Sequence, residues 1–181
     1  MPDGYARPDP TVERDFARLF ESEFGYAWNS LRRMGVREAD VEDQVHELFL
    51  RAHRHFGELD PHRPARPWLY AFAVRVASEY RRAPRNRRET PGLAEELRDS
   101  SPNVEERVAR AETQARVLQA LERLDLDRVA VLVGIDIDGH TGPEMAAALG
   151  IPLNTVYSRL RLARSDFKAA LQRVRGSKEL A

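Results

Sequence analysis

The sequence predicts an all-α fold made of two small helical domains that a flexible linker joins. Apolar residues recur at helical spacing along most of the 181 residues, and no segment has a convincing strand pattern. Residues 89–103 combine turn formers and charged residues with little apolar content, as is typical of a linker. The length suits one ordinary domain or two small ones.

The first domain, residues 12–88, is expected to hold three helices that share one core. They cover about 12–34, 38–56 and 67–82, and Gly35 can close the first of them. The expected core residues are Val12, Phe16, Leu19, Phe20, Ala27, Trp28, Leu31, Val41, Val45, Leu48, Phe49, Ala52, Phe56, Trp68, Leu69, Phe72, Val76 and Tyr80. Residues 1–11 are polar and proline-rich, and we expect a disordered arm there.

The second domain, residues 104–175, is expected to begin with a helix over 104–124 and a short apolar helix over 127–137. Val108, Ala111, Ala115, Leu118, Leu121 and Leu124 form the apolar stripe of the first of these helices. The tail, residues 176–181, is expected to fray.

Residues 141–164 carry the pattern of a helix-turn-helix. Thr141 and Glu144 have the spacing of a capping box, and Gly150 can adopt the left-handed conformation that ends a helix. Pro152 suits the first turn of the next helix. The stripe Val156, Leu160 and Ala163 leaves polar and basic residues on the other faces of that helix. A second helix of this kind enters the major groove of DNA.

The charges are unevenly distributed although they cancel overall. Residues 61–88 hold eight arginines against the single acid Glu79, residues 89–106 are acidic, and residues 159–175 are basic again. Around Trp68 and Tyr70 the arginines are interleaved with aromatic rings, which favours binding of single-stranded nucleic acid by stacking and phosphate contact. The alternative is that these charges form ordinary solvated helix faces and that the aromatic residues belong to the core.

Several function classes are disfavoured by composition. The chain has no cysteine, which excludes disulfides, zinc fingers and thiol catalysis. His46 and Glu47 begin like a zinc-protease motif, but Leu50 stands where the second histidine is needed, and His53 lies two turns on. Asp136 and Asp138 could form a carboxylate pair, although a helix end explains them equally well. We expect no enzyme activity and no cofactor.

Membrane insertion is also not expected, because no apolar run approaches the roughly 20 residues that span a bilayer. The N-terminus lacks the apolar region of a secretory signal, so the expected location is the cytoplasm. The helix over 38–56 carries acidic residues beside apolar ones. Such a face would repel DNA and would suit a basic protein partner instead. Its acidic residues are Asp40, Glu42, Asp43 and Glu47.

Taken together, the order of these pieces resembles the extracytoplasmic-function (ECF) sigma factors, the two-domain branch of the sigma-70 family. Region two of that family is similar to ADVEDQVHELFLRAHRHFGELDPHRPARPWLYAFAVRVASEYRR. Region four is similar to LERLDLDRVAVLVGIDIDGHTGPEMAAALGIPLNTVYSRLRLARSDFKAAL. With the first helix, the resemblance covers about residues 12–174.

The resemblance implies a protein that binds RNA polymerase core and directs promoter-specific initiation, with an anti-sigma factor as a further partner. The partners in the polymerase would be the clamp coiled coil of the beta-prime subunit and the beta flap. The clamp would contact Asp40, Asp43, Gln44, Glu47 and Phe49. Melting and binding of the minus-ten element would fall to Arg63, Arg66, Trp68, Tyr70, Arg75, Glu79, Arg81 and Arg82. The minus-thirty-five element would contact Asn154, Thr155, Tyr157, Ser158, Arg159, Arg161 and Arg164.

Some positions depart from the family pattern. Arg75 stands where asparagine is frequent, Glu79 where aspartate is, and Tyr157 where lysine is. Asp125-Leu126 replaces a usual Leu-Pro, and Ile135 falls where arginine is common. These departures leave the promoter sequence open. Two other interpretations remain: a helix-turn-helix operator-binding regulator that does not bind core polymerase, and a metal-dependent hydrolase using His46, Glu47 and His53.

Overall fold

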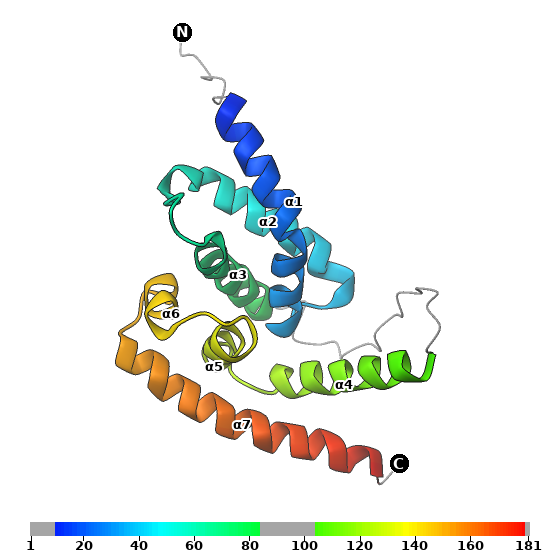
Figure 1. Ribbon diagram of the computed structural model, residues 1–181. Coiled ribbons are helices and arrows are strands. Elements are labelled where there is room, and N and C mark those ends of the chain that lie inside the picture. Colours follow the sequence, from blue (N-terminus) through cyan, green and yellow to red (C-terminus); the bar gives the residue numbers. More distant parts are fainter. Residues whose placement is uncertain (1–9, 84–103, 180–181) are drawn as a thin grey trace.

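The computed structural model describes residues 10–83 and 104–179, and every regular element within these two ranges is helical (Figure 1). The predicted all-α class is confirmed. The elements are α1 (Pro10–Arg33), α2 (Glu38–Arg54), the 3-10 turn η1 (Phe56–Glu58), α3 (Ala65–Arg82), α4 (Val104–Glu122), α5 (Leu126–Leu132), the π-helical turn η3 (Val133–Ile137), α6 (Gly142–Leu149) and α7 (Leu153–Glu179). The predicted linker and most of the predicted N-terminal arm lie outside the described residues.

Helices α1, α2 and α3 form the N-terminal unit around an apolar core. Gly35, with φ 91°, makes the turn after α1, and buried Met34 and Val36 flank it. Phe49 of α2 meets Phe16 and Phe20 of α1 edge to face. Val12 was expected in this core but is 41% exposed, because the first turns of α1 project beyond its neighbours (Figure 1).

Three predicted boundaries need correction. Helix α1 begins at Pro10, inside the expected arm, and α3 begins at Ala65 rather than Pro67. Pro10 and Pro67 both lie in the first turn of their helices, where proline is tolerated because the first N–H groups of a helix have no partner within the helix. Helix α7 continues to Glu179 through most of the tail that was expected to fray. The side chain of Val174, on the last described turns of α7, is still buried.

Helices α4 to α7 form the C-terminal unit, in which the long α7 packs against α4, α5 and α6. The predicted capping box is confirmed: Thr141 Oγ1 accepts from the Glu144 backbone N–H, and the Glu144 carboxylate accepts from the Thr141 N–H at 2.7 Å. Gly150 adopts the left-handed conformation that ends α6, with φ 65°. Val108 and Ala111 were expected inward but are exposed. The first half of α4 therefore runs beyond the core.

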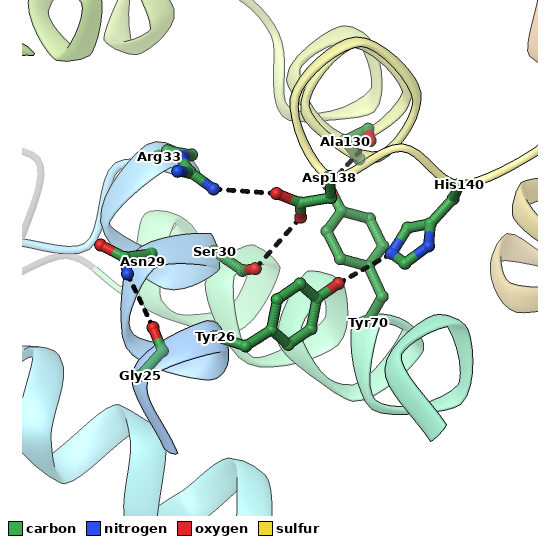
Figure 2. A network of polar contacts seen from close by, with 9 residues as sticks. All are labelled: Gly25, Tyr26, Asn29, Ser30, Arg33, Tyr70, Ala130, Asp138 and His140. Atoms are coloured by element: carbon green, nitrogen blue, oxygen red, sulfur yellow. Dashed lines mark hydrogen bonds and ion pairs between the residues drawn. The ribbon is translucent and has the colours of Figure 1, made fainter. Parts of the chain in front are cut away.

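The single helix expected over 127–137 is instead α5 followed by the π-helical turn η3. There the Asp138 N–H donates to the Val133 carbonyl and the His140 N–H donates to the Gly134 carbonyl, both at 2.8 Å. The wider turn, with Gly139 at φ 77°, ends the helix. It also turns the side chains of Asp138 and His140 toward α1 (Figure 2).

The two units pack against each other, an arrangement that the sequence left open. Helix α3 contacts α6, α1 contacts α4, and one apolar cluster runs through both units. Figure 1 shows α5 and α6 lying between α3 and α7. Gly134 permits this closeness, because a Cβ there would lie 2.5 Å from Met145 Sδ and 3.3 Å from a Tyr70 ring carbon. We call this arrangement the closed form.

Candidate nucleic-acid interface

The N-terminal half of α7 presents a polar face to solvent. Its exposed members are Asn154, Tyr157, Ser158, Arg161 and Arg164, while Thr155 and Arg159 are half-buried. The inward stripe Val156, Leu160 and Ala163 is buried as predicted, and it fixes this face outward. All seven residues expected to contact the minus-thirty-five element thus lie on one helix.

Two arginines of this face are held in place by aspartates of the same unit. Arg159 pairs with Asp127 at 2.8 Å. Arg164 donates two hydrogen bonds to the Asp136 carboxylate, which lower the pKa of Asp136. Exposed pairs of this kind contribute little stability, so a phosphate can replace the aspartate at low cost.

The minus-ten candidates on α3 and in the loop before it are more scattered. Arg63 lies in the exposed loop beside Asp60, and Arg75 is exposed with its guanidinium 5.8 Å from the Phe72 ring. Trp68 is half-buried and meets Phe72 edge to face, with ring centroids 4.9 Å apart.

Three further candidates are engaged in contacts within the N-terminal unit. Arg66 donates to the Glu23 carboxylate at 2.8 Å and lies over the Tyr26 ring. Glu79 accepts two hydrogen bonds from Arg51 at 2.7 Å, which lower the pKa of Glu79. Arg82 is exposed and donates to Ser78 Oγ. Glu79 therefore orients an arginine of α2, and a direct contact with DNA would have to break that pair.

Two candidates are covered by the C-terminal unit. Tyr70 is fully buried, and its hydroxyl donates to the Ala130 carbonyl of α5 at 2.8 Å. Arg81 is half-buried, donates to the Leu124 carbonyl at 2.9 Å, and keeps one Nη1 without a hydrogen-bond partner. Burial lowers the pKa of Arg81. In the closed form Tyr70 is therefore inaccessible, and the Arg81 guanidinium is held by the Leu124 carbonyl.

A groove of about 730 Å³ runs along the start of α3. Trp68, Phe72 and Arg75 line it from α3, and Glu144 and Ala147 line it from α6. The groove beside the candidate stacking residue is therefore shared between the two units.

The acidic face of α2 is present as expected. Asp43 is exposed and Gln44 is half-exposed, whereas Glu47 pairs with Arg51, and Asp40 pairs with Arg37. Phe49 differs from the other candidates, because it is buried under α2 and supports the helix rather than lining its outer face.

Within the two described ranges no group of three or more metal-ligating side chains comes together. His46 stacks against Phe20, and His53 meets Phe16 edge to face. Asp136 and Asp138 do not act as a pair, because Asp136 bonds Arg164 whereas Asp138 bonds Arg33 of α1. No helix of the described residues is long and apolar enough to cross a membrane.

Sequence reasoning missed a polar network between the units (Figure 2). Asp138 accepts from Arg33 at 2.8 Å and from Ser30 at 3.3 Å, and Tyr26 Oη lies 2.8 Å from His140 Nε2. The signal in the sequence is weak: Asp138-Gly139-His140 follows directly on an apolar helix, where a turn explains such residues well enough.

Comparison with known proteins identifies the class. The model "Sigma-70 region 2" matches residues 19–88, and "Sigma-70, region 4" matches residues 114–167. The first range covers most of the N-terminal unit, and the second covers most of the C-terminal unit. The chain belongs to the sigma-70 family, and it is an RNA polymerase sigma factor of the ECF group.

Named relatives agree with this assignment. The sigma factor NccH of Alcaligenes xylosoxydans xylosoxydans is 30% identical over 180 residues, which cover 91% of this chain and 97% of NccH. CnrH of Cupriavidus metallidurans is 30% identical, over 88% of this chain and 87% of CnrH. The sigma-E factor of Escherichia coli is 29% identical, over 76% of each chain.

Solved structures show the same fold. CnrH in complex with the cytosolic domain of CnrY matches with a TM-score of 0.65 and 28% identity, over 88% of this chain and 89% of CnrH. RpoE in complex with the anti-sigma factor NepR, from Bartonella quintana, matches with a TM-score of 0.65 and 17% identity, over 88% of this chain and 98% of RpoE.

Proposed function

We propose that this sigma factor binds RNA polymerase core through α2, opens the minus-ten element with α3 and reads the minus-thirty-five element with α7. The observation that carries the proposal is the charge separation between its helices. The outer face of α2 is acidic, with Asp43 exposed, whereas the outer face of α7 is polar and basic. One face is suited to a basic protein surface and the other to DNA phosphates.

The DNA contacts follow from helix geometry. A helix that exposes Ser158, Arg161 and Arg164 after a capped turn can lie in a major groove, with arginines on phosphates and guanine edges. On α3, Trp68 offers a half-exposed ring for stacking, and Arg75 of α3 and Arg63 of the preceding loop bring positive charge to the same groove. Polymerase would hold the two units at promoter spacing, so that two weak contacts act together.

The direct test is transcription from a pool of genomic fragments by purified core polymerase, with the 5′ ends of the transcripts sequenced. We expect new start sites that share two upstream elements, and only when the protein is added. Core polymerase that neither binds the protein nor changes its start sites would favour the operator-binding regulator instead.

A charge-reversal variant of α2 tests the proposed contact with core polymerase. Asp43→Arg reverses charge on the exposed part of α2, so we expect at least about tenfold weaker binding to core and unchanged binding to duplex DNA. Glu21→Arg, at an exposed acid on α1, is the matched control. An equal loss in both binding assays would indicate misfolding and remove Asp43 from the interface.

A protein inhibitor is a further proposed partner, because CnrH was solved with the cytosolic domain of CnrY. The expected inhibitor binds the purified sigma factor and abolishes its start sites in the same transcription assay. A binder that leaves transcription unchanged does not fill this role.

A further inference from the structure

The polar face of α7 carries three arginines, and two of them are bound by carboxylates of the same unit. Arg159 pairs with Asp127 of α5 at 2.8 Å, and Arg164 pairs with Asp136 of η3 at 2.7 Å. Arg161, which lies between them in the sequence, is exposed and makes no ion pair with any described residue. The arginines of one DNA-facing helix are therefore presented in two different ways.

The two paired arginines lie at opposite edges of this face. Because the stripe around Leu160 points inward, Ser158 lies near the centre of the outward side. At 3.6 residues per turn, Arg159 is rotated from Ser158 by about 100° in one direction and Arg164 by about 120° in the other. A helix that lies in a major groove has a phosphate backbone along each edge. Both paired arginines are therefore on the sides where phosphates would lie.

Each aspartate competes with DNA for its arginine. A guanidinium that donates to a carboxylate must give up that partner in order to donate to a phosphate, and the carboxylate left behind repels the phosphate. At Arg164 the competition involves two hydrogen bonds to Asp136, of 2.7 and 2.8 Å. Water screens both pairs, so the competition lowers the affinity for phosphate without preventing the exchange.

The two ion pairs are not required to hold the C-terminal unit together. The Asp127 side chain is 67% exposed and the Arg164 side chain is 57% exposed, and pairs of this kind contribute little to stability. Apolar packing between α5 and α7, which includes buried Val129 and Leu160, already fixes these helices against each other. A change at either aspartate should therefore alter DNA binding while the fold is kept.

We propose that Asp127 and Asp136 are positioning residues that restrain the arginines they pair with, and that they thereby weaken sequence-independent binding of duplex DNA by α7. The inference rests on the proposed function of α7. Sequence-independent binding consists of phosphate contacts, so it is the part of the affinity that the two aspartates reduce. The centre of the face, at Ser158, carries no such restraint and stays available for base contacts.

A double-mutant cycle on the full chain tests the proposal. The probe is a fluorescein-labelled duplex of mixed sequence, about 20 base pairs long, and its fluorescence anisotropy gives the Kd. Asp136→Asn keeps the shape of the side chain and removes the competing charge, so we expect binding to become about threefold tighter, as befits an exposed ion pair. In the Arg164→Ala background the same change should have no effect, because no arginine is left to release.

A second cycle and a control complete the design. Asp127→Asn, with and without Arg159→Ala, repeats the measurement at the other edge of the helix. Glu112→Gln is the matched control, since it breaks an ion pair of 2.7 Å with Arg116 on α4, away from the polar face of α7. It should leave the Kd unchanged. Circular dichroism melting of each variant shows whether its helices are intact.

Tighter binding that disappears when the matching arginine is removed supports the proposal for that pair. An equal gain with and without the arginine overturns it, because the aspartate would then repel DNA directly. Unchanged or weaker binding in a folded aspartate variant overturns it as well. If neither the wild-type chain nor any variant binds the duplex, the proposed function of α7 fails together with the role of the aspartates, whereas wild-type binding without coupling contradicts that role alone.

Discussion

The two candidate DNA surfaces of this sigma factor differ in how they are presented. On α7 the polar residues face outward, and the arginine pairs that restrain them are exposed and easily exchanged for phosphate. On α3 and in the loop before it the candidates are divided: Arg63 of the loop and Arg75 of the helix are exposed, whereas Tyr70 is buried against the other unit. The α7 candidates therefore share one solvent-facing side of a helix, whereas the C-terminal unit covers part of the α3 surface in the closed form.

Two tyrosines provide the strongest contrast. Tyr70→Ala removes a fully buried ring and its bond to Ala130, and we expect a loss of about 3–5 kcal/mol in the free energy of unfolding. Tyr157→Ala removes a ring that is 51% exposed, and we expect less than about 1 kcal/mol. Urea titration measures both. Equal losses would erase the distinction between a structural and a surface tyrosine.

A pair of glycines compares the close approaches on the two sides of α6. Alanine at Gly134 would press into Met145 and Tyr70, both fully buried, so we expect about 1–3 kcal/mol of destabilisation. Alanine at Gly142 would meet the half-exposed Tyr157 hydroxyl, which can move aside. Thermal melting should therefore give a clearly lower melting temperature for Gly134→Ala than for Gly142→Ala. The reverse order would mean that Met145 can move out of the way.

On α7, a variant of Arg159 tests whether this helix recognises the base sequence of duplex DNA. Arg159→Ala should weaken binding to a minus-thirty-five duplex by about 1–3 kcal/mol if the side chain reaches a base edge. Arg161→Ala, a phosphate candidate, should weaken binding to all sequences alike and reduce its dependence on salt. Fluorescence anisotropy at two salt concentrations separates the two effects. Unchanged binding by Arg159→Ala would exclude this residue from the reading face.

The smallest expected effect is a pH dependence of the closed form. Burial lowers the pKa of His140, so the closed form is stable above the ordinary value near 6.5 and weakens as the pH falls through it. Asp138 and Glu144 oppose this shift, Arg66 favours it, and Tyr26 accepts or donates beside the ring.

Burial raises the pKa of Asp138, which acts in the opposite direction, but its ordinary value lies far below pH 6. From pH 7.5 to 6.0 the closed population relative to the open one should therefore fall, by at most about fourfold. Energy transfer between dyes on Glu42→Cys of α2 and Lys168→Cys of α7, both exposed, measures the change, and His140→Gln should abolish it. A closed form that strengthens over this range would contradict the role given to His140.

Local signals predicted much of this structure. Gly35, the Thr141–Glu144 capping box and Gly150 act on backbone within a few residues of themselves, so their effects are visible in sequence. The outward face of α7 also follows from the spacing of its apolar residues. The burial of Tyr70 could not be read in this way, because it depends on a second unit docking on α3. Tyr70, Ala73 and Ala77 do form a second apolar stripe on that helix, and all three are buried.

The network at Asp138 and His140 was hidden for a related reason. Its partners lie more than one hundred residues away in the chain, and the π-helical turn that points them toward α1 has no distinct sequence pattern. Asp136 and Asp138 look equivalent in sequence. Positions two apart on a helical turn point to roughly opposite sides, and here Asp136 bonds α7 whereas Asp138 bonds α1.

The central claim is that this sigma factor binds core polymerase through α2 and recognises two promoter elements with α3 and α7. Transcription of genomic fragments by purified core polymerase, with the 5′ ends of the transcripts sequenced, tests this claim most directly. We predict start sites that share two upstream elements when the protein is added, and loss of these sites with Asp43→Arg. Start sites that the protein leaves unchanged would contradict the account.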